Sequence, residues 1–136
     1  MCLTCFLKPV TRKTENEMVF YKVLNDLGKT SDNRQWYETP FKNFEVNLGK
    51  EYSEDGEDFS VDELYDRWTV SGGGFHLFRD YEDADNETVR LKYHPMTPFY
   101  DYVVVKAIVP KGTPYIEGRF NSCPCLIVKK VRYEKL

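Results

Sequence analysis

The segment YDYVVVKAIVP, residues 100–110, decides the fold class of this chain. It is rich in β-branched residues, and Pro110 ends it because proline cannot donate a backbone hydrogen bond to a sheet. This pattern predicts a buried strand, and the alternating segment EMVFYKVLND, residues 17–26, predicts another. The second strand should present one face with Val19, Tyr21 and Val23 and an opposite face with Phe20, Lys22 and Leu24.

Shorter segments complete the expected set of elements. A capping pattern, Ser60 followed by Glu63, predicts a short helix over residues 61–68, and RDYEDADNE predicts a helical turn. The sequence therefore predicts an α+β fold, with five to seven strands in an antiparallel or mixed sheet and one or two short helices. The further strands expected are FKNFEVNLGKEY (41–52), GFHLF (74–78), TPYIEG (113–118) and CLIVKKVRY (125–133).

Length and composition indicate one folded unit. The chain has 136 residues, of which 41% are hydrophobic and 30% charged, so we expect a single globular domain over residues 1–136. Within it, residues 1–16 form an N-terminal arm and residues 53–60 an acidic loop. No apolar run reaches the length of a membrane span, and the apolar stretch near the N-terminus is too short to be the core of a secretion signal. We therefore expect a cytoplasmic protein with no membrane partner.

The charge is distributed unevenly along the chain. The net charge of −3 combines −5 in residues 1–68 with +2 in residues 69–136. Binding to DNA without sequence preference needs a broad cationic surface, so we do not expect DNA to be a partner. A small anionic ligand is compatible with this distribution.

The four cysteines permit two interpretations. In a cytoplasmic protein they are expected to be free thiols, with no cofactor. The alternative is a zinc ion held by four thiolates that join the two ends of the chain. Its ligands would be Cys2, Cys5, Cys123 and Cys125.

The segment SGGGFHLF, residues 71–78, places a histidine directly after three glycines. In a strand, the side chain of His76 lies opposite those of Phe75 and Leu77. One interpretation is a hydrogen-bonded histidine at the edge of the core, and the other is a histidine that faces a ligand beside a glycine loop. The glycines lack the residues and the spacing of the known phosphate-binding motifs.

The order of several motifs resembles a group of small uncharacterised proteins from gut bacteria and their phages. The resemblance covers nearly the whole chain and implies an origin in a phage or a mobile element. The extra cysteines, Cys5, Cys123 and Cys125, depart from the group. The motifs are the opening MCL, then VFYKVL, TPFKNFEVNLGKEY, GGGFHLFRDYEDA and VVKAIVPKGTPYIEG.

A fainter pattern is similar to the ADP-ribosyltransferase-like fold. It consists of YKV with Lys22, GFHLFRDYEDA, and VKAIVPKGTPYIEG. The resemblance implies a ligand cleft bordered by these three segments, in which Glu117 is the carboxylate that orients a ribose. The chain departs from the family pattern because Lys22 replaces the usual Arg or His and because no Ser-Thr-Ser is present. Likeness of fold alone does not transfer an activity.

These observations lead to three hypotheses for function. The first is a non-enzymatic accessory protein of a phage or mobile element that binds a nucleotide-like ligand or a host protein in the host cytoplasm, for example to inhibit host defence. The second is an ADP-ribosyltransferase-like or NAD-cleaving enzyme that uses His76, Lys22 and Glu117. The third is a minor structural or virion-associated protein. The residues predicted to bind the ligand are Tyr21, Lys22, Gly73, Gly74, Phe75, His76, Tyr115 and Glu117.

Overall fold

Two long antiparallel strands form the centre of the structure. The computed structural model describes residues 3–40, 44–56, 58–65, 67–94 and 101–136. Strands β3 (Met18–Lys29) and β10 (Asp101–Val109) pair continuously, from Asp26 opposite Asp101 to Met18 opposite Val109. Both strands were predicted from the sequence, and both predictions are confirmed.

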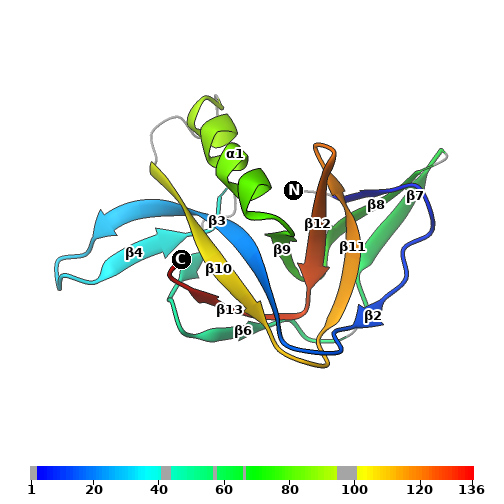
Figure 1. Cartoon of the computed structure of the whole chain (residues 1–136), viewed down its shortest axis with the longest axis horizontal. Helices are drawn as coiled ribbons and strands as arrows, with labels where there is room; N and C mark the ends of the chain where they lie inside the picture. Colours follow the sequence, from blue (N-terminus) through cyan, green and yellow to red (C-terminus); the bar gives the residue numbers. More distant parts are fainter. Residues whose placement is uncertain (1–2, 41–43, 57, 66, 95–100) are drawn as a thin grey trace.

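The described residues form thirteen strands in one antiparallel sheet, with one helix packed on it (Figure 1). The main path of the sheet runs β6-β13-β10-β3-β9-β12-β11-β1-β8-β7, while β2 pairs with β11, and β4 pairs with β3 and β5. The remaining strands are β1 (Leu3–Cys5), β2 (Arg12–Lys13), β4 (Gln35–Glu38), β5 (Glu45–Val46), β6 (Glu51–Ser53), β7 (Ser60–Leu64), β8 (Arg67–Gly72), β9 (Phe75–Phe78), β11 (Pro114–Phe120), β12 (Cys123–Val128) and β13 (Lys130–Glu134).

The sheet divides into two parts at a narrow junction. Strand β3 meets β9 through a single registered pair, Tyr21 and Phe78, whereas β11 and β12 pair along six positions. One part therefore consists of β3, β10 and their neighbours, and the other of β9, β12, β11, β1, β8 and β7. Figure 1 shows β9 at the boundary, with β3 and β10 on one side of it and the other strands of the second part on the other side.

Helix α1 (Tyr81–Lys92) covers one face of the sheet near the junction, where it contacts β3, β9 and β10. Its buried face includes Ala84 and Leu91, which are 0% and 1% exposed. Acidic residues in the first turn and basic residues in the last turn complement the helix dipole. The sequence predicted only a helical turn here, and the helix extends five residues beyond the predicted segment.

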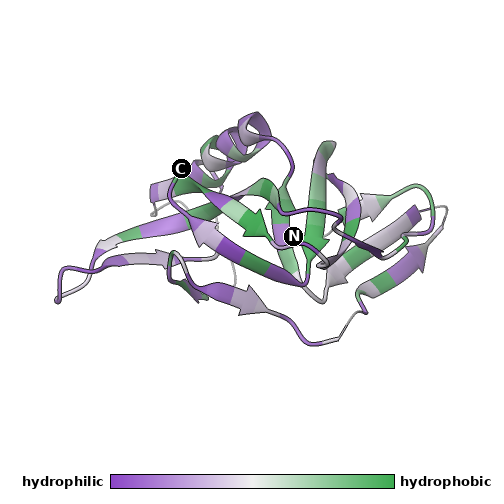
Figure 2. Ribbon diagram, turned by 60° about the horizontal axis from the view of Figure 1, so that its bottom comes forward, coloured by the Kyte–Doolittle hydropathy of each residue, from purple (hydrophilic) through white to green (hydrophobic). Residues whose placement is uncertain are grey.

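Apolar side chains form one core cluster on each face of the sheet, because successive residues of a strand point to opposite sides. Figure 2 shows the hydrophobic stretches gathered toward the centre of the molecule. The helix-side core comprises Leu3, Cys5, Val23, Val70, Phe78, Ala84, Leu91, Val104, Ile116, Cys125 and Ile127. The far-side core comprises Phe20, Leu24, Val46, Leu77, Val105, Ala107, Val109, Leu126, Val128, Val131 and Tyr133.

The predicted fold class, α+β with five to seven strands and one or two helices, is wrong. The described chain is mostly β, with a single helix and thirteen strands. The prediction counted too few strands because several are only two or three residues long, such as β2 and β5. Strands this short carry no recognisable alternation and form only because a partner strand provides hydrogen bonds.

The helix predicted over residues 61–68 is also wrong, since β7 and β8 form an antiparallel hairpin there. Val61 and Trp68 both pack against the helix-side core. Burial of alternate side chains stabilises the strand form, and a helix of about two turns has little stability of its own. A capping pattern formed by Ser60 and Glu63 alone does not outweigh that burial.

Two segments predicted as single strands are each divided in two. Residues 41–52 contribute β5 and the start of β6, with residues 41–43 outside the described part. The closing segment, residues 125–133, is interrupted at Lys129 between β12 and β13. Lys129 is only 4% exposed. Its ammonium donates to the Asp58 carbonyl and lies 4.5 Å from the centre of the Phe59 ring.

Candidate functional site

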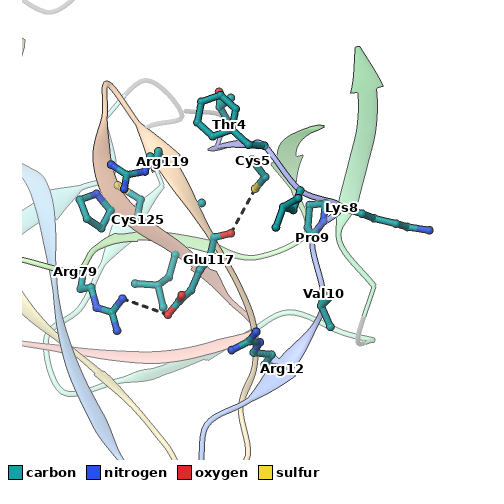
Figure 3. Close-up of a pocket in the computed structure, with 15 residues that line it drawn as sticks. Thr4, Cys5, Lys8, Pro9, Val10, Arg12, Arg79, Glu117, Arg119 and Cys125 are labelled. Atoms are coloured by element: carbon teal, nitrogen blue, oxygen red, sulfur yellow. Dashed lines mark hydrogen bonds and ion pairs between the residues drawn. The ribbon is translucent and has the colours of Figure 1, made fainter. Parts of the chain in front are cut away.

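The structure contains a pocket of about 540 Å³ between the N-terminal arm and the strands β11 and β12 (Figure 3). We call it the arm pocket. Its size falls within the range of small-molecule sites. Residues 6–11, which we call the strap, pass from β1 to β2 and supply one wall of the pocket. The lining residues are Thr4, Cys5, Phe6, Leu7, Lys8, Pro9, Val10, Arg12, Arg79, Glu117, Gly118, Arg119, Pro124, Cys125 and Leu126.

The strap is held at both of its ends. At the first end, β1 lies between β11 and β8 in the sheet. At the second end, β2 pairs with β11, and the buried hydroxyl of Thr14 donates to the Pro110 carbonyl at 2.7 Å. The same hydroxyl accepts a hydrogen bond from the Thr113 backbone N–H at 3.0 Å. These contacts position the strap over β11, so the pocket belongs to the folded structure of the arm.

Gly118 allows the arm to approach β11 closely. A Cβ atom at this position would lie 2.8 Å from the Leu3 Cβ and 3.0 Å from the Cys5 Sγ, closer than real contacts allow. The Cys5 thiol also donates a hydrogen bond to the Glu117 carbonyl, with an S–O distance of 3.4 Å. The close contact at one end of the pocket therefore depends on the absence of a side chain at Gly118.

The lining of the pocket is strongly cationic. It contains the guanidinium groups of Arg12, Arg79 and Arg119 against the single carboxylate of Glu117. Lys8 also lines the pocket, but its ammonium points away and lies 5.8 Å from the centre of the Trp68 ring. The Arg79 guanidinium lies 3.5 Å from a carboxylate oxygen of Glu117, and both side chains are nearly half exposed. In Figure 3 the side chains of Arg79 and Arg12 flank that of Glu117. Cations concentrated in a concave site raise the local concentration of anions.

The two thiols in the pocket lining are poorly suited to nucleophilic chemistry. Burial raises the pKa of the Cys125 thiol to about 12, and burial also raises the pKa of Cys5. A thiol reacts through its thiolate, and a raised pKa reduces the thiolate fraction at neutral pH. The arm pocket is therefore better suited to binding than to covalent chemistry through these cysteines.

The predicted zinc site is only partly visible. Cys2 lies outside the described residues. Cys5 and Cys125 belong to the helix-side core, and Cys123 packs against it. Among the described residues no group of three or more His, Cys, Asp or Glu side chains has the geometry to hold a metal ion. Zinc remains a prediction from the sequence.

The structure brings some of the predicted ligand-binding residues together and separates others. Phe75, Val128 and Tyr115 form one row across β9, β12 and β11, with Phe75 and Tyr115 packed on the far-side core. His76, Ile127 and Ile116 form the next row, in which both isoleucines belong to the helix-side core. His76 therefore lies on the opposite face from Phe75, as the alternation predicted.

Glu117 follows Ile116 on β11, so its side chain points to the face opposite that of His76. Glu117 lines the arm pocket, and His76 is buried at 9% exposure outside its lining. Lys22 donates from its ammonium to the His76 backbone carbonyl at 2.9 Å. His76 and Glu117 therefore do not face a common ligand in this structure.

The remaining predicted residues have packing roles. Tyr21 packs against the helix-side core and meets the Tyr81 ring edge-on, with ring centres 5.7 Å apart. A Cβ on Gly74 would lie 2.5 Å from the Val128 carbonyl oxygen. Gly73 has φ +91°, and a Cβ there would lie 3.0 Å from the Asp58 carbonyl oxygen. The glycines therefore permit close approach of the chain to itself.

Sequence reasoning missed the cations of the pocket, Lys8, Arg12, Arg79 and Arg119. Lys8 and Arg12 are four residues apart in the N-terminal arm, whereas Arg79 follows β9 and Arg119 lies on β11, far away in the sequence. The one available signal was the concentration of cations in KPVTRK, residues 8–13.

Comparisons with models of protein families, with curated proteins and with solved structures found no match. The described part of the chain has no helix with the length and apolar character needed to cross a membrane.

Proposed function

We propose that the protein is a non-enzymatic binding protein whose arm pocket takes a small nucleotide-like anion. The observation that carries the proposal is the set of three arginine side chains around one pocket of about 540 Å³. A role as an accessory factor of a phage or mobile element, acting in the host cytoplasm on a host signal, agrees with the resemblance described above.

The arginines of the arm pocket favour a ligand that carries an anionic group with several oxygens. The three cations of the pocket are all arginines, which come from β2, from the residue that follows β9, and from β11. A guanidinium donates two parallel hydrogen bonds to a phosphate or a carboxylate, which gives geometric selectivity as well as attraction. Arg79 and Arg119 each have a partner, since Arg79 pairs with Glu117 and Arg119 donates to the Ser122 carbonyl at 3.1 Å. These contacts hold the two guanidinium groups in place before a ligand arrives.

Glu117 adds a hydrogen-bond acceptor to this cationic lining. A carboxylate repels a bare phosphate but accepts hydrogen bonds from sugar hydroxyls. A phosphorylated sugar therefore fits the lining better than inorganic phosphate does. The resemblance to the ADP-ribosyltransferase-like fold implies the same contact between Glu117 and a ribose, and this contact requires no catalysis.

The enzymatic hypothesis receives less support. It requires His76, Lys22 and Glu117 to act on one ligand, whereas the strand register points the side chains of His76 and Glu117 to opposite faces. We therefore do not include a catalytic role in the proposal.

The direct test is a thermal-shift and calorimetry series with AMP, ADP-ribose, NAD, cyclic nucleotides and inorganic phosphate. A ligand at one hundred times its Kd stabilises the folded state by about 2.7 kcal/mol. Arg12→Gln should weaken binding about tenfold or more, because a charge-assisted hydrogen bond is lost. The matched control is Lys106→Gln on β10, an exposed cation outside the pocket lining, which should bind as the wild type does.

No thermal shift with any of these ligands would contradict the proposal. The remaining hypotheses, a host-protein partner or a structural component, would then be tested by pull-down and by light scattering.

A further inference from the structure

The strap exposes apolar side chains at the mouth of a cationic pocket. Phe6, Leu7 and Val10 all line the arm pocket and are 67%, 84% and 65% exposed. Most exposed apolar residues of a soluble protein occur singly, whereas a group beside a polar site marks a binding surface. These side chains would lose contact with water if a ligand with an apolar part lay beneath the strap.

Phe6, the one aromatic residue among these three side chains, contacts a cation. The guanidinium of Arg67, on β8, lies 5.6 Å from the centre of the Phe6 ring. Lys8, two residues farther along the strap, has its ammonium 5.8 Å from the centre of the Trp68 ring. Both contacts join the strap to β8 by cation–π attraction. Because Phe6 is 67% exposed even beside Arg67, much of its surface is open to a flat ligand.

We infer that the strap binds the aromatic base of the ligand, which stacks on Phe6 while the phosphate binds the arginines. This inference rests on the proposed function and specifies it further: the ligand is a nucleotide, with a planar ring, rather than a sugar phosphate or another small anion. Stacking on an aromatic side chain favours any base, so Phe6 selects for the presence of a base and not for its identity.

The test compares AMP with ribose 5-phosphate, two ligands that share the phosphate and the ribose and differ in the base. Stacking of one base on an aromatic side chain changes affinity by about tenfold or more, so AMP should bind at least that much more tightly to the wild type. In Phe6→Ala the affinity for AMP should fall to that for ribose 5-phosphate, whose own affinity should not change. Phe6→Trp should restore the preference.

A matched control variant separates stacking from a general loss of apolar surface. Phe44 is 66% exposed, almost the same as Phe6, and does not line the arm pocket. Phe44→Ala should leave both affinities unchanged. Since both phenylalanines are exposed, neither substitution should prevent folding.

Limited chymotrypsin digestion gives a second readout. AMP should slow cleavage after Phe6 and Leu7, while cleavage after Tyr65, which is 92% exposed outside the pocket lining, should continue at the same rate. Equal affinity of the wild type for AMP and ribose 5-phosphate, or equal weakening of both by Phe6→Ala, would overturn the inference and leave the proposed function in place. If AMP, ribose 5-phosphate and inorganic phosphate all fail to bind, the inference and the proposed function are both overturned.

Discussion

The β3–β10 ladder and the strap differ in almost every property that stabilises a protein. In the ladder, backbone pairing continues from one end of β10 to the other, and Leu24 and Val105 are 0% and 1% exposed. The strap joins strands of three and two residues and keeps Phe6 and Leu7 mostly in water. Apolar side chains in the ladder stabilise the fold, whereas the same kinds of side chain in the strap remain available to a ligand. Stability and binding should therefore be separable by substitution.

The largest effect is expected in the ladder. Leu24→Ala removes a fully buried side chain from the far-side core and should lower the free energy of unfolding by about 2–5 kcal/mol. Urea unfolding followed by circular dichroism measures the loss. Val19→Ala, on the same strand but 47% exposed, is the control and should change stability by less than about 0.5 kcal/mol. Similar losses in the two variants would show that burial of the Leu24 side chain is not the source of the ladder's stability.

The ladder was also the region that the sequence predicted best. The β-branched residues of β10 and the alternation in β3 are local signals, and both strands were identified. The β7–β8 hairpin was missed because its strand form depends on packing of Val61 and Trp68 against the helix-side core, whose residues lie elsewhere in the chain. Local patterns cannot report contacts of this kind.

The candidate site was predicted in part for the same reason. Glu117 was identified from the sequence, and it lines the arm pocket. Arg12 and Arg79 were not identified, although their side chains lie on either side of the same carboxylate in Figure 3. They are 67 positions apart in the sequence. They approach each other only because β2 pairs with β11 and β9 pairs with β12 in the sheet. A charge that is isolated in the sequence gives no indication of the charges that the sheet places beside it.

An intermediate effect is expected at Cys125, which lines the pocket but is only 1% exposed. Burial raises its pKa to about 12 from an ordinary value of 9.0. Between these two values the unfolded chain loses a proton that the folded protein keeps, so stability should fall as pH rises above about 9. This one group can contribute at most about 1.4 kcal/mol per pH unit.

Urea unfolding at pH 8, 9 and 10 measures this slope. Burial also raises the pKa values of Cys5 and Tyr133, so they contribute in the same direction. Cys125→Ala should be less stable at pH 8 but should lose less stability between pH 9 and pH 10 than the wild type. An unchanged slope in the variant would mean that Cys125 ionises as readily in the folded protein as in the unfolded chain.

The smallest effect on stability is expected from two exposed ion pairs, and their comparison separates binding from folding most directly. Arg34 lies 3.7 Å from Glu45 near the β4–β5 pairing, and Arg79 lies 3.5 Å from Glu117 in the arm pocket. Exposed pairs contribute about 0–1 kcal/mol, so Arg34→Gln and Arg79→Gln should both unfold within about 1 kcal/mol of the wild type.

Their effects on ligand binding should differ. Arg79→Gln removes a guanidinium from the pocket and leaves the charge of Glu117 without its partner, so affinity for AMP should fall about tenfold or more. Arg34 does not line the pocket, so Arg34→Gln should bind AMP as the wild type does. Calorimetry at low and high salt measures both variants, and the difference between them should diminish at high salt because the ligand is attracted by charge. Equal affinities at low salt would mean that the guanidinium of Arg79 stabilises Glu117 alone and contributes nothing to an anion in the pocket.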